Sequence, residues 1–289
     1  MDVDLRKLRY FVAVAEELHF GRAAERLHIG QPVLSRQIRA LEHELRAELF
    51  RRDRRSTELT DAGRQLLADA TGLLASAQAL QRRVQLAARG ARRFTVAFMP
   101  GVIVTAPVQA LARSRPALEI DVLRTSYADQ VAVIHDGRAD VSFIRMPAEQ
   151  RGLKLLPLYS EPRVVVLPAG HRLAGKATLS IHDLAGERLL QDPDAVPEWR
   201  DLPRPDGVRA VQRPIATVEE KLEYVAAGQG MVILPLSAAA YYTRTDVAGI
   251  PVDDIGPSQV CLAWSAERRS TLIEEFVAAA KSATNGEGA

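Results

Sequence analysis

Apolar residues recur at helical spacing after a short break in the chain near residue 30. Placed on a helix at about 100° per residue, they form one stripe made up of Leu34, Ile38, Leu41 and Leu45. The opposite side of the same helix carries Pro32, Arg36, Arg39 and His43, with Ser35 beside them. The pattern predicts an amphipathic helix that buries the stripe in a core and turns a basic face outwards.

The run before the break predicts a second, shorter helix that packs closely against the first. Its inner side carries the small residues Ala23 and Ala24. Gly30 allows a sharp turn, Gln31 is placed to cap the following helix, and Pro32 suits its first position because the missing N–H costs nothing there. Two helices joined in this way form a helix-turn-helix, whose second helix can enter the DNA major groove. Any helical protein can contain such a connection, so the neighbouring segments must decide between the two interpretations.

Residues 46–60 predict a small two-stranded wing. Leu49 and Phe50 are apolar, residues 53–56 are typical of a tight turn, and Leu59 resumes an extended pattern. The turn is surrounded by four arginines, Arg51, Arg52, Arg54 and Arg55. An isolated arginine cluster is usually a solvated surface, but one placed beside a recognition helix binds phosphates.

A long helix is predicted for residues 61–89, with Thr60 as its cap and Gly90 at its end. Apolar residues follow it in alternating steps of four and three, at Leu66, Ala70, Leu73, Ala77, Leu80, Val84 and Ala87. This is a heptad seam, and about 29 residues span roughly 43 Å, more than a small winged domain can cover. We therefore expect the helix to pair with its copy in a second chain rather than to pack only on its own domain. The seam fixes neither parallel nor antiparallel pairing.

From Phe94 onwards, short apolar runs alternate with helical ones. Strands are predicted for the runs FTVAFM, LEIDVL, ADVSFI, RVVVLP, VRAVQ, MVILP and VCLAW. Helices are predicted for the runs VTAPVQALARSR, YADQVAVIHDG, VEEKLEYVAAG and TLIEEFVAAAKS. The alternation is typical of an α/β domain with a mostly parallel sheet, and its length favours two sub-domains.

Charge is distributed unevenly along the 289 residues. Residues 1–93 contain 18 Lys and Arg against 12 Asp and Glu, a formal charge of +6, whereas residues 94–289 contain 20 against 24, a charge of −4. The start of the chain lacks the pattern of a secretion signal, and no apolar run approaches the roughly twenty residues of a membrane helix. A cytoplasmic protein is therefore expected. The single cysteine, Cys261, lies in an apolar run and is interpreted as a small buried hydrophobe.

Residues 5–90 resemble the N-terminal region of the LysR-type transcriptional regulators. The resemblance rests on the runs LRYFVAVAEELHF, AAERLHIGQPVLSRQIRALEHEL, LFRR and LTDAGRQLL. The family usually has a glycine after the second helix of the motif, where this chain has Arg46. The resemblance implies an all-α winged helix-turn-helix domain at residues 1–60, a linker and dimerisation helix at 61–90, and an effector-binding domain at 91–289.

The resemblance also implies that the α/β domain has the two-lobed fold of the periplasmic solute-binding proteins. Lobe I is expected at about 91–160 and 268–289, and lobe II at about 163–265, with the chain crossing near 160–163 and returning near 265–268. The expected partners are promoter DNA, a small-molecule effector that we take to be a carboxylate, further copies of the chain in a homodimer or homotetramer, and RNA polymerase. No cofactor is expected.

Three sets of residues are predicted to form the functional sites. DNA contacts are expected from Arg22, Gln31, Pro32, Val33, Ser35, Arg36, Arg39, Arg52, Arg54 and Arg55. Dimer contacts are expected from Leu66, Leu73, Leu80 and Val84. Effector contacts are expected from Pro100, Gly101, Val102, Thr125, Ser126, Arg145, Gln191 and Thr217. The effector set follows from its position between strand ends and helix starts, where free N–H groups gather.

The hydroxyls of the effector set have an ordinary alternative role as helix caps, and Arg145 has one as a member of a surface ion pair. The stretch 192–207, rich in proline and aspartate, is expected to form a long loop at the rim of the cleft or on the surface.

Two other classes of protein fit the sequence less well than a regulator does. An enzyme lacks support because the sequence has no nucleophile elbow, phosphate-binding glycine loop or metal-binding histidine motif. The trio His135, Asp136 and Asp140 fits a solvated helix end better than a catalytic group. A transport-type solute-binding protein would explain two lobes but would leave residues 1–90 unexplained.

Overall fold

The computed structural model describes residues 4–52, 57–88, 93–203, 205, 207–208, 210, 215 and 217–286. The chain divides into two compact units, one that contains the residues up to Gln85 and one that contains nearly all of the remainder from Leu86. Each unit has its own hydrophobic core.

The N-terminal unit is a winged helix-turn-helix followed by a long helix. Its elements are α1 (Leu5–Glu17), α2 (Phe20–Arg26), α3 (Gln31–Leu45), β1 (Phe50–Arg52), β2 (Thr57–Leu59) and α4 (Asp61–Ala88). The two strands pair antiparallel, with Phe50 opposite Leu59, so the predicted wing strands are present. The turn that joins them, together with Arg54 and Arg55, lies outside the described residues.

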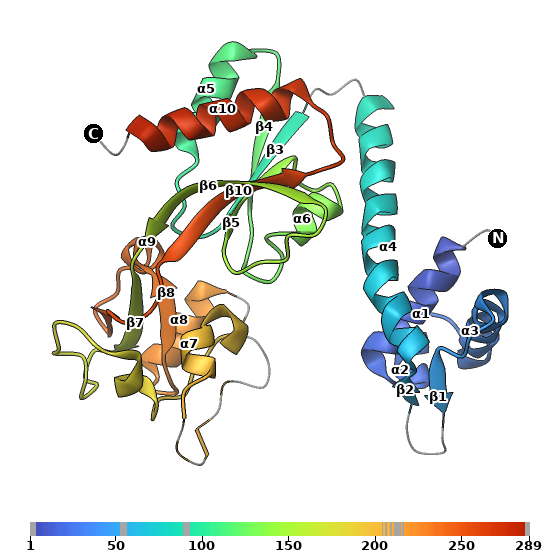
Figure 1. Cartoon of the computed structure of the whole chain (residues 1–289), viewed down its shortest axis with the longest axis horizontal. Coiled ribbons are helices and arrows are strands. Elements are labelled where there is room, and N and C mark those ends of the chain that lie inside the picture. Colours follow the sequence, from blue (N-terminus) through green and yellow to red (C-terminus); the bar gives the residue numbers. More distant parts are fainter. Residues whose placement is uncertain are drawn as a thin grey trace. The chain divides into compact units, whose positions relative to one another are not determined.

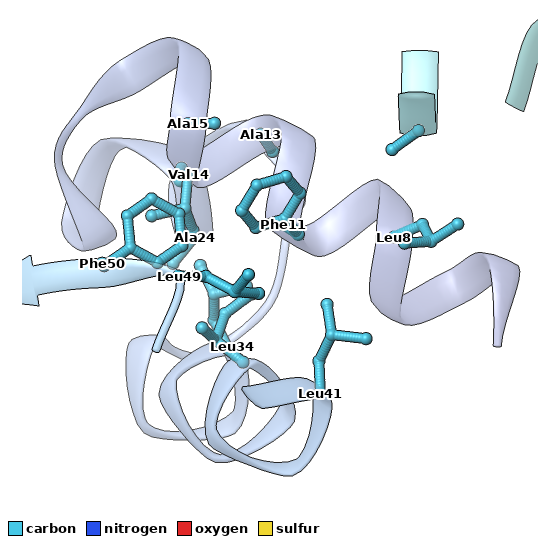
Figure 2. Close-up of a cluster of buried hydrophobic side chains, with 13 residues drawn as sticks. Leu8, Phe11, Ala13, Val14, Ala15, Ala24, Leu34, Leu41, Leu49 and Phe50 are labelled. Carbon is cyan, nitrogen blue, oxygen red and sulfur yellow. The ribbon is translucent and has the colours of Figure 1, made fainter. Parts of the chain in front are cut away.

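The core of this unit lies where the three short helices meet the first wing strand. Leu34, Ile38 and Leu41 of α3 are at most 1% exposed, so the predicted stripe is buried. Figure 2 shows Leu34 and Leu41 pointing from α3 towards Phe11 of α1 and towards the wing strand. The rings of Phe11 and Phe50 pack at 5.4 Å between centroids, which joins α1 to β1.

The turn between α2 and α3 differs from the prediction in its details. Gly30 is the N-cap of α3, with an extended backbone (φ −70°), and Gln31 is the first helical residue rather than the cap. The sharp bend falls instead on His28, whose φ is +54°. Because His28 adopts the left-handed conformation two positions before the N-cap, it reverses the chain, and Gly30 does not need a positive φ.

Thr60 caps α4 as predicted. Its hydroxyl accepts a hydrogen bond from the N–H of Gly63 at 3.0 Å and donates one to the carbonyl of Glu48 at 2.6 Å. Gly63 is required by close packing, since a Cβ atom there would lie 2.2 Å from the carbonyl oxygen of Leu49. The start of the long helix is thereby fixed to the wing.

Arg46 ends α3 in the left-handed conformation, with φ +53° and ψ +37°. Its backbone N–H donates to the carbonyls of Glu42 and His43, which completes the helix end. The geometry normally supplied by a glycine is therefore kept, although a side chain in this region is disfavoured by roughly 1–2 kcal/mol.

We expect Arg46→Gly to stabilise the N-terminal unit by about 0.5–1 kcal/mol, because the relief of strain exceeds the added freedom of the unfolded chain. Hydrogen exchange of the core amides of α1 and α3 measures the change in local opening free energy. Arg46→Ala is the matched control, since it removes the charge but keeps the Cβ atom and the strain. Equal protection in the glycine and alanine variants would contradict the explanation.

The second unit contains two sheets with helices around them. Its helices are α5 (Thr105–Ser114), α6 (Ala132–His135), η1 (Ile181–Leu184), η2 (Pro193–Ala195), α7 (Pro197–Arg200), α8 (Val218–Ala226), α9 (Leu236–Tyr241) and α10 (Thr271–Gly286). Its strands are β3 (Arg93–Phe98), β4 (Glu119–Arg124), β5 (Val141–Arg145), β6 (Leu153–Glu161), β7 (Arg163–Pro168), β8 (Val232–Pro235), β9 (Val247–Pro251) and β10 (Ser258–Ser265). We call the five-stranded sheet and its helices α5, α6 and α10 lobe I, and the rest of the unit lobe II.

Lobe I is built on a mixed sheet in the strand order β4-β3-β5-β10-β6. β3 runs parallel to β4 and β5, whereas β10 is antiparallel to both of its neighbours. α5 and α10 lie together on one face of the sheet (Figure 1). The ring of Phe276 in α10 packs on Phe94 and Phe143 of the sheet, at 5.5 and 6.2 Å between centroids.

Lobe II contains a three-stranded antiparallel sheet in the order β8-β7-β9. Side chains of β7 alternate between two apolar clusters, with Val165 and Leu167 in one and Val164 and Val166 in the other. Both faces of this strand are therefore buried, which explains its continuous apolar sequence.

Several predicted elements need correction. The sheets are not mostly parallel, because the chain crosses between lobes twice and its long strands β6 and β10 pair in opposite directions. β10 belongs to lobe I, so the second crossing precedes Ser258 and does not lie near 265–268. The helix predicted for 127–137 is reduced to Ala132–His135, and β6 and β9 were not predicted. The strand predicted for 208–212 lies largely outside the described residues.

Candidate functional site

The outer face of α3 is exposed and basic. Pro32, Arg36, Arg39 and His43 are exposed along one side of the helix, while Leu34 and Ile38 on the other side are fully buried. Within the described part of the chain, no carboxylate lies within ion-pairing distance of Arg36 or Arg39. Their guanidinium groups therefore face solvent without internal neutralisation, which suits contact with a phosphate or a base.

The other predicted DNA residues differ in their surroundings. Gln31 and Val33 are exposed at the start of α3, and Ser35 is half-buried. Arg22 pairs with the carboxylate of Glu17 at 3.3 Å and donates to the backbone carbonyl of the same residue. Arg52 belongs to β1, but the placement of its side chain is outside what the structure describes.

The heptad seam of α4 divides into two parts. Its first part packs on the core of its own unit, since Ala70 is buried and Leu66 is half-buried against the same cluster. Its second part is open, with Leu73, Leu80 and Val84 exposed by 47, 57 and 59%. Large apolar side chains in a regular row on a helix surface are typical of an interface with another helix.

A cavity of about 730 Å³ lies between the two lobes of the second unit. All eight predicted effector residues are described, and those that line the cavity are Pro100, Thr125, Ser126, Arg145, Gln191 and Thr217. Its volume is in the range of sites that enclose small ligands, and its walls expose mainly apolar surface among polar and charged side chains.

Gly101 and Val102, which complete the predicted set, do not line this cavity. Val102 is buried in the core of lobe I. Gly101 has φ +81°, and a Cβ atom there would lie 2.5 Å from the backbone nitrogen of Ala238. The glycine thus permits close approach of the two lobes beside the cavity rather than contact with a ligand.

Arg145 was predicted either to face the cleft or to form a surface ion pair, and its pairing is instead buried. Its guanidinium lies 2.7 Å from the carboxylate of Glu161 and donates hydrogen bonds to Ser258 and Ser237. The second carboxylate oxygen of Glu161 accepts from the backbone N–H of Ser237 at 2.6 Å. The positive charge is therefore compensated within the protein, at the point where β6 leaves lobe I and α9 of lobe II begins.

The three predicted hydroxyls have different hydrogen-bond partners. Thr125 is buried and donates to the carbonyl of Phe98 at 3.1 Å, so it is not a helix cap. Ser126 donates to the carboxylate of Asp129 at 2.7 Å. Thr217 caps α8 in a capping box with Glu220, so its oxygen accepts from a backbone N–H. Among the described residues, no group accepts the hydroxyl proton of Thr217, so the proton can be donated to a ligand.

Sequence reasoning missed several charged and polar residues that line the cavity. Arg124 at the end of β4 pairs with Glu219 of α8 at 2.9 Å and with the hydroxyl of Tyr242 at 3.0 Å. Tyr127 donates to the carbonyl of Pro147, and burial together with the charge of Asp192 raises the pKa of its phenol. These contacts join segments far apart in sequence, so local patterns do not reveal them. The one available signal was the position of Arg124 directly after a strand-like run that precedes a predicted helix.

The groups weighed for enzymatic or metal chemistry have structural roles. Asp140 accepts from the backbone N–H of Thr95 at 2.6 Å and pairs with Arg268. Cys261 is buried as predicted, and burial raises the pKa of its thiol. The described residues contain no group of three or more candidate metal ligands. Among the same residues, no helix is both long and apolar enough to cross a membrane.

Two protein-family models match the chain. The bacterial regulatory helix-turn-helix protein of the lysR family matches residues 5–64. The LysR substrate binding domain matches residues 87–285. The two matches correspond to the winged unit with the start of α4 and to the two-lobed unit.

Relatives and solved structures with the same organisation cover most of the chain. The probable cat1 operon transcriptional activator of Acinetobacter lwoffii is 35% identical over 248 residues, which cover 82% of each chain. The Hca operon transcriptional activator HcaR of Escherichia coli (strain K12) is 30% identical over 289 residues, or 96% of each chain.

The crystal structure of CbnR, described as a LysR family transcriptional regulator, is 25% identical with a TM-score of 0.58 and covers 98% of this chain and 99% of that one. Full-length CbnR in complex with its target DNA matches with 25% identity and a TM-score of 0.52, covering 98% of this chain and 100% of that one. These relatives are named as regulators and not as enzymes. The chain therefore belongs to the LysR family of bacterial transcriptional regulators, DNA-binding proteins whose activity is modulated by a small molecule at their substrate-binding domain.

Proposed function

We propose that this regulator reads promoter DNA through the exposed side of α3 and responds to a small molecule in the cavity between its lobes. The observation that carries the proposal is the division of α3 into a buried apolar side and a basic side whose Arg36 and Arg39 have no ion-pair partner among the described residues. A helix held rigidly by its inner face can present its outer face to base edges.

Within the DNA site, the residues are proposed to have two roles. Ser35 and Arg36 contact bases or nearby phosphates. Further DNA contacts from the same helix come from Gln31, Pro32, Val33 and Arg39. Arg22, Arg52, Arg54 and Arg55 contact the backbone and fix the orientation of the unit on the duplex. The basic balance of residues 1–93 supports this arrangement.

The working form is proposed to be a homodimer that assembles further into a homotetramer, with α4 pairing between chains through Leu73, Leu80 and Val84. Leu66 lies on the same helix, but its side chain packs against the core of its own unit. Because promoter DNA and RNA polymerase are the proposed partners, we place the protein in the cytoplasm.

Arg36→Ala is expected to weaken operator binding by about 1–3 kcal/mol and to relax the sequence preference, because a guanidinium that reads a base edge is lost. The measurement is a gel shift on the DNA upstream of the regulator's own gene and of its neighbour, with base-substituted duplexes as competitors. Arg54→Ala should weaken binding to all sequences alike and reduce its salt dependence.

Arg113→Ala is the matched control for these variants, because Arg113 is exposed on α5 of the second unit. It removes the same charge from the chain and should leave operator affinity unchanged. If Arg36→Ala and Arg113→Ala bind every duplex equally well, the assignment of α3 as the reading helix is wrong.

A further inference from the structure

The cavity between the lobes carries four basic side chains, and three of them are neutralised internally. Arg124 pairs with Glu219, Arg145 with Glu161 and Arg163 with Glu198. Each of these guanidinium groups also contacts a second group of the protein, as Arg163 does with the carbonyl of Gly256 at 2.7 Å. None of the three carries an uncompensated charge towards the cavity.

Lys221 is the fourth basic residue of the cavity, and its surroundings differ. It lies in the second turn of α8, one turn after the capping residue Thr217, and both residues line the cavity. Across the described part of the chain, its ammonium group makes no hydrogen bond and no ion pair. The charge of Asp192 acts on Lys221 from beyond ion-pairing distance, and the Asp192 carboxylate accepts a hydrogen bond from the N–H of Asp194.

The ammonium group of Lys221 is half-buried and has no partner among the residues that the structure describes, which is unfavourable for a cation. The apolar surroundings of Lys221 lower its pKa from the ordinary value, and Asp192 opposes this only in part. A cation that is half withdrawn from water, with no partner among the described residues, loses hydration that none of those residues replaces. An anion placed in the cavity beside Lys221 would supply the missing partner.

The walls around this cation indicate the remainder of the ligand. Met99, Pro100 and Met146 line the lobe I side, and Ile215 and Val218 line the lobe II side near Lys221. These side chains form apolar patches that favour an apolar body, while most of the charged groups elsewhere in the lining are already paired with one another. The hydroxyl proton of Thr217, which is not needed for capping, is available to the same anion.

We propose that Lys221 binds the anionic group of the effector, and that the effector is a small amphipathic monocarboxylate whose apolar body contacts the methionine and proline side chains of lobe I. This inference rests on the proposed effector role of the cavity and assigns the charge contact to Lys221 rather than to Arg145. Arg145 keeps its role in joining the lobes.

The test uses the full-length protein and matched pairs of probes. The probes are straight-chain and phenyl-substituted monocarboxylates of four to nine carbons, each compared with its primary amide by isothermal titration calorimetry. We expect at least one acid to bind roughly 10- to 100-fold more tightly than its amide, the range expected for a hydrogen bond to a charged group. Equal affinity for acids and amides, or no binding of any acid, would overturn the proposal.

Three variants locate the contact. Lys221→Met keeps the apolar stem and should lose the preference for the acid, whereas Lys221→Arg should retain it in part. Lys221→Glu should reject the acid and bind the corresponding primary amine. Lys154→Met is the control, because Lys154 is exposed on β6 and does not line the cavity. Retention of the full acid preference by Lys221→Met would overturn the assignment.

The melting temperature of the ligand-free protein distinguishes a role of Lys221 in binding the acid from a purely structural role. We expect Lys221→Met to melt at or above the wild-type temperature, since it removes a half-buried charge that has no partner among the described residues. A large decrease would show that Lys221 supports the fold and would contradict the proposal. Gel shifts with the same acids distinguish the Lys221 contact from the proposed effector role of the cavity. If an acid binds but leaves DNA binding unchanged, the Lys221 contact stands and the effector role is contradicted.

Discussion

Leu73→Glu is expected to convert the regulator to smaller assemblies and to weaken its binding to a full operator by roughly 10²- to 10⁴-fold. The magnitude is that of losing a second linked binding module, because one DNA-binding unit alone reads only a half-site. A carboxylate at this position of α4 would be placed in an apolar contact between two helices, where nothing compensates its charge. Sedimentation velocity measures the assembly, and gel shifts on full and half operators measure the affinity.

The exposure of Leu73 makes this test specific. Because 47% of its surface is open within one chain, the substitution leaves the core of its own unit intact. Ala70 differs, since it is buried in that core and a charge there would unfold the unit. The matched control is Gln78→Glu, which adds the same charge at an exposed position about 140° round the helix from Leu73.

Wild-type assembly of the Leu73→Glu variant would show that α4 does not pair through this row of side chains. A loss of assembly in the Gln78→Glu variant as well would indicate a general effect of charge on the helix. Half-site affinity is the internal check, because it depends on one unit and should stay close to the wild-type value in both variants.

Local patterns predicted the winged unit well because its helices are held by contacts close in sequence. The spacing of Leu34, Ile38 and Leu41 alone identified the buried side of α3, and all three are fully buried. Details set by backbone conformation were harder to foresee, since the bend falls on His28 and not on Gly30. Either residue type is compatible with such a turn, and the choice depends on how α2 packs against α3.

The two-lobed unit was less predictable because its pairings are long-range. β6 contains Pro157 and a shift of register against β10, which disguise its strand pattern in the sequence. β9 carries a glycine and ends in a proline, which disguise it in the same way. The direction of β10 depends on a crossing between lobes that no local signal records. The family resemblance supplied the two-lobed architecture, while the placement of β10 required the structure.

The cavity illustrates the same limit at the level of single residues. Position at or after a strand end brought Thr125 and Arg145 to one cavity, and Thr217, whose predicted preceding strand lies largely outside the described residues, lines the same cavity. Position could not show that Glu161 neutralises Arg145, because the two meet only when β6 crosses towards lobe II. Nor could it distinguish Lys221 from the other basic residues of the cavity, since they differ in which of them has an ion-pair partner within the described part of the chain.

Arg145→Met is expected to destabilise the two-lobed unit by about 3–5 kcal/mol, because the carboxylate of Glu161 would remain buried without its cation. The side chains of Arg145 and Glu161 are only 5% and 11% exposed, so solvent cannot replace the lost contact. Urea unfolding followed by tryptophan fluorescence reports on this unit alone, because Trp199 and Trp264 both belong to it.

The double variant Arg145→Met/Glu161→Gln should recover most of that loss. A glutamine is neutral, and its side-chain oxygen can still accept the hydrogen bond that the backbone N–H of Ser237 gives to Glu161. The two substitutions are therefore expected to be strongly non-additive, with a coupling free energy of about 3 kcal/mol or more, because Glu161→Gln alone would leave the Arg145 cation buried without its partner. Additive effects, or a loss below about 1 kcal/mol in Arg145→Met, would show that the pair does not hold the lobes together. If Arg145→Met kept its stability but lost the response to the acids that bind the wild type, Arg145 and not Lys221 would be the counter-charge of the effector.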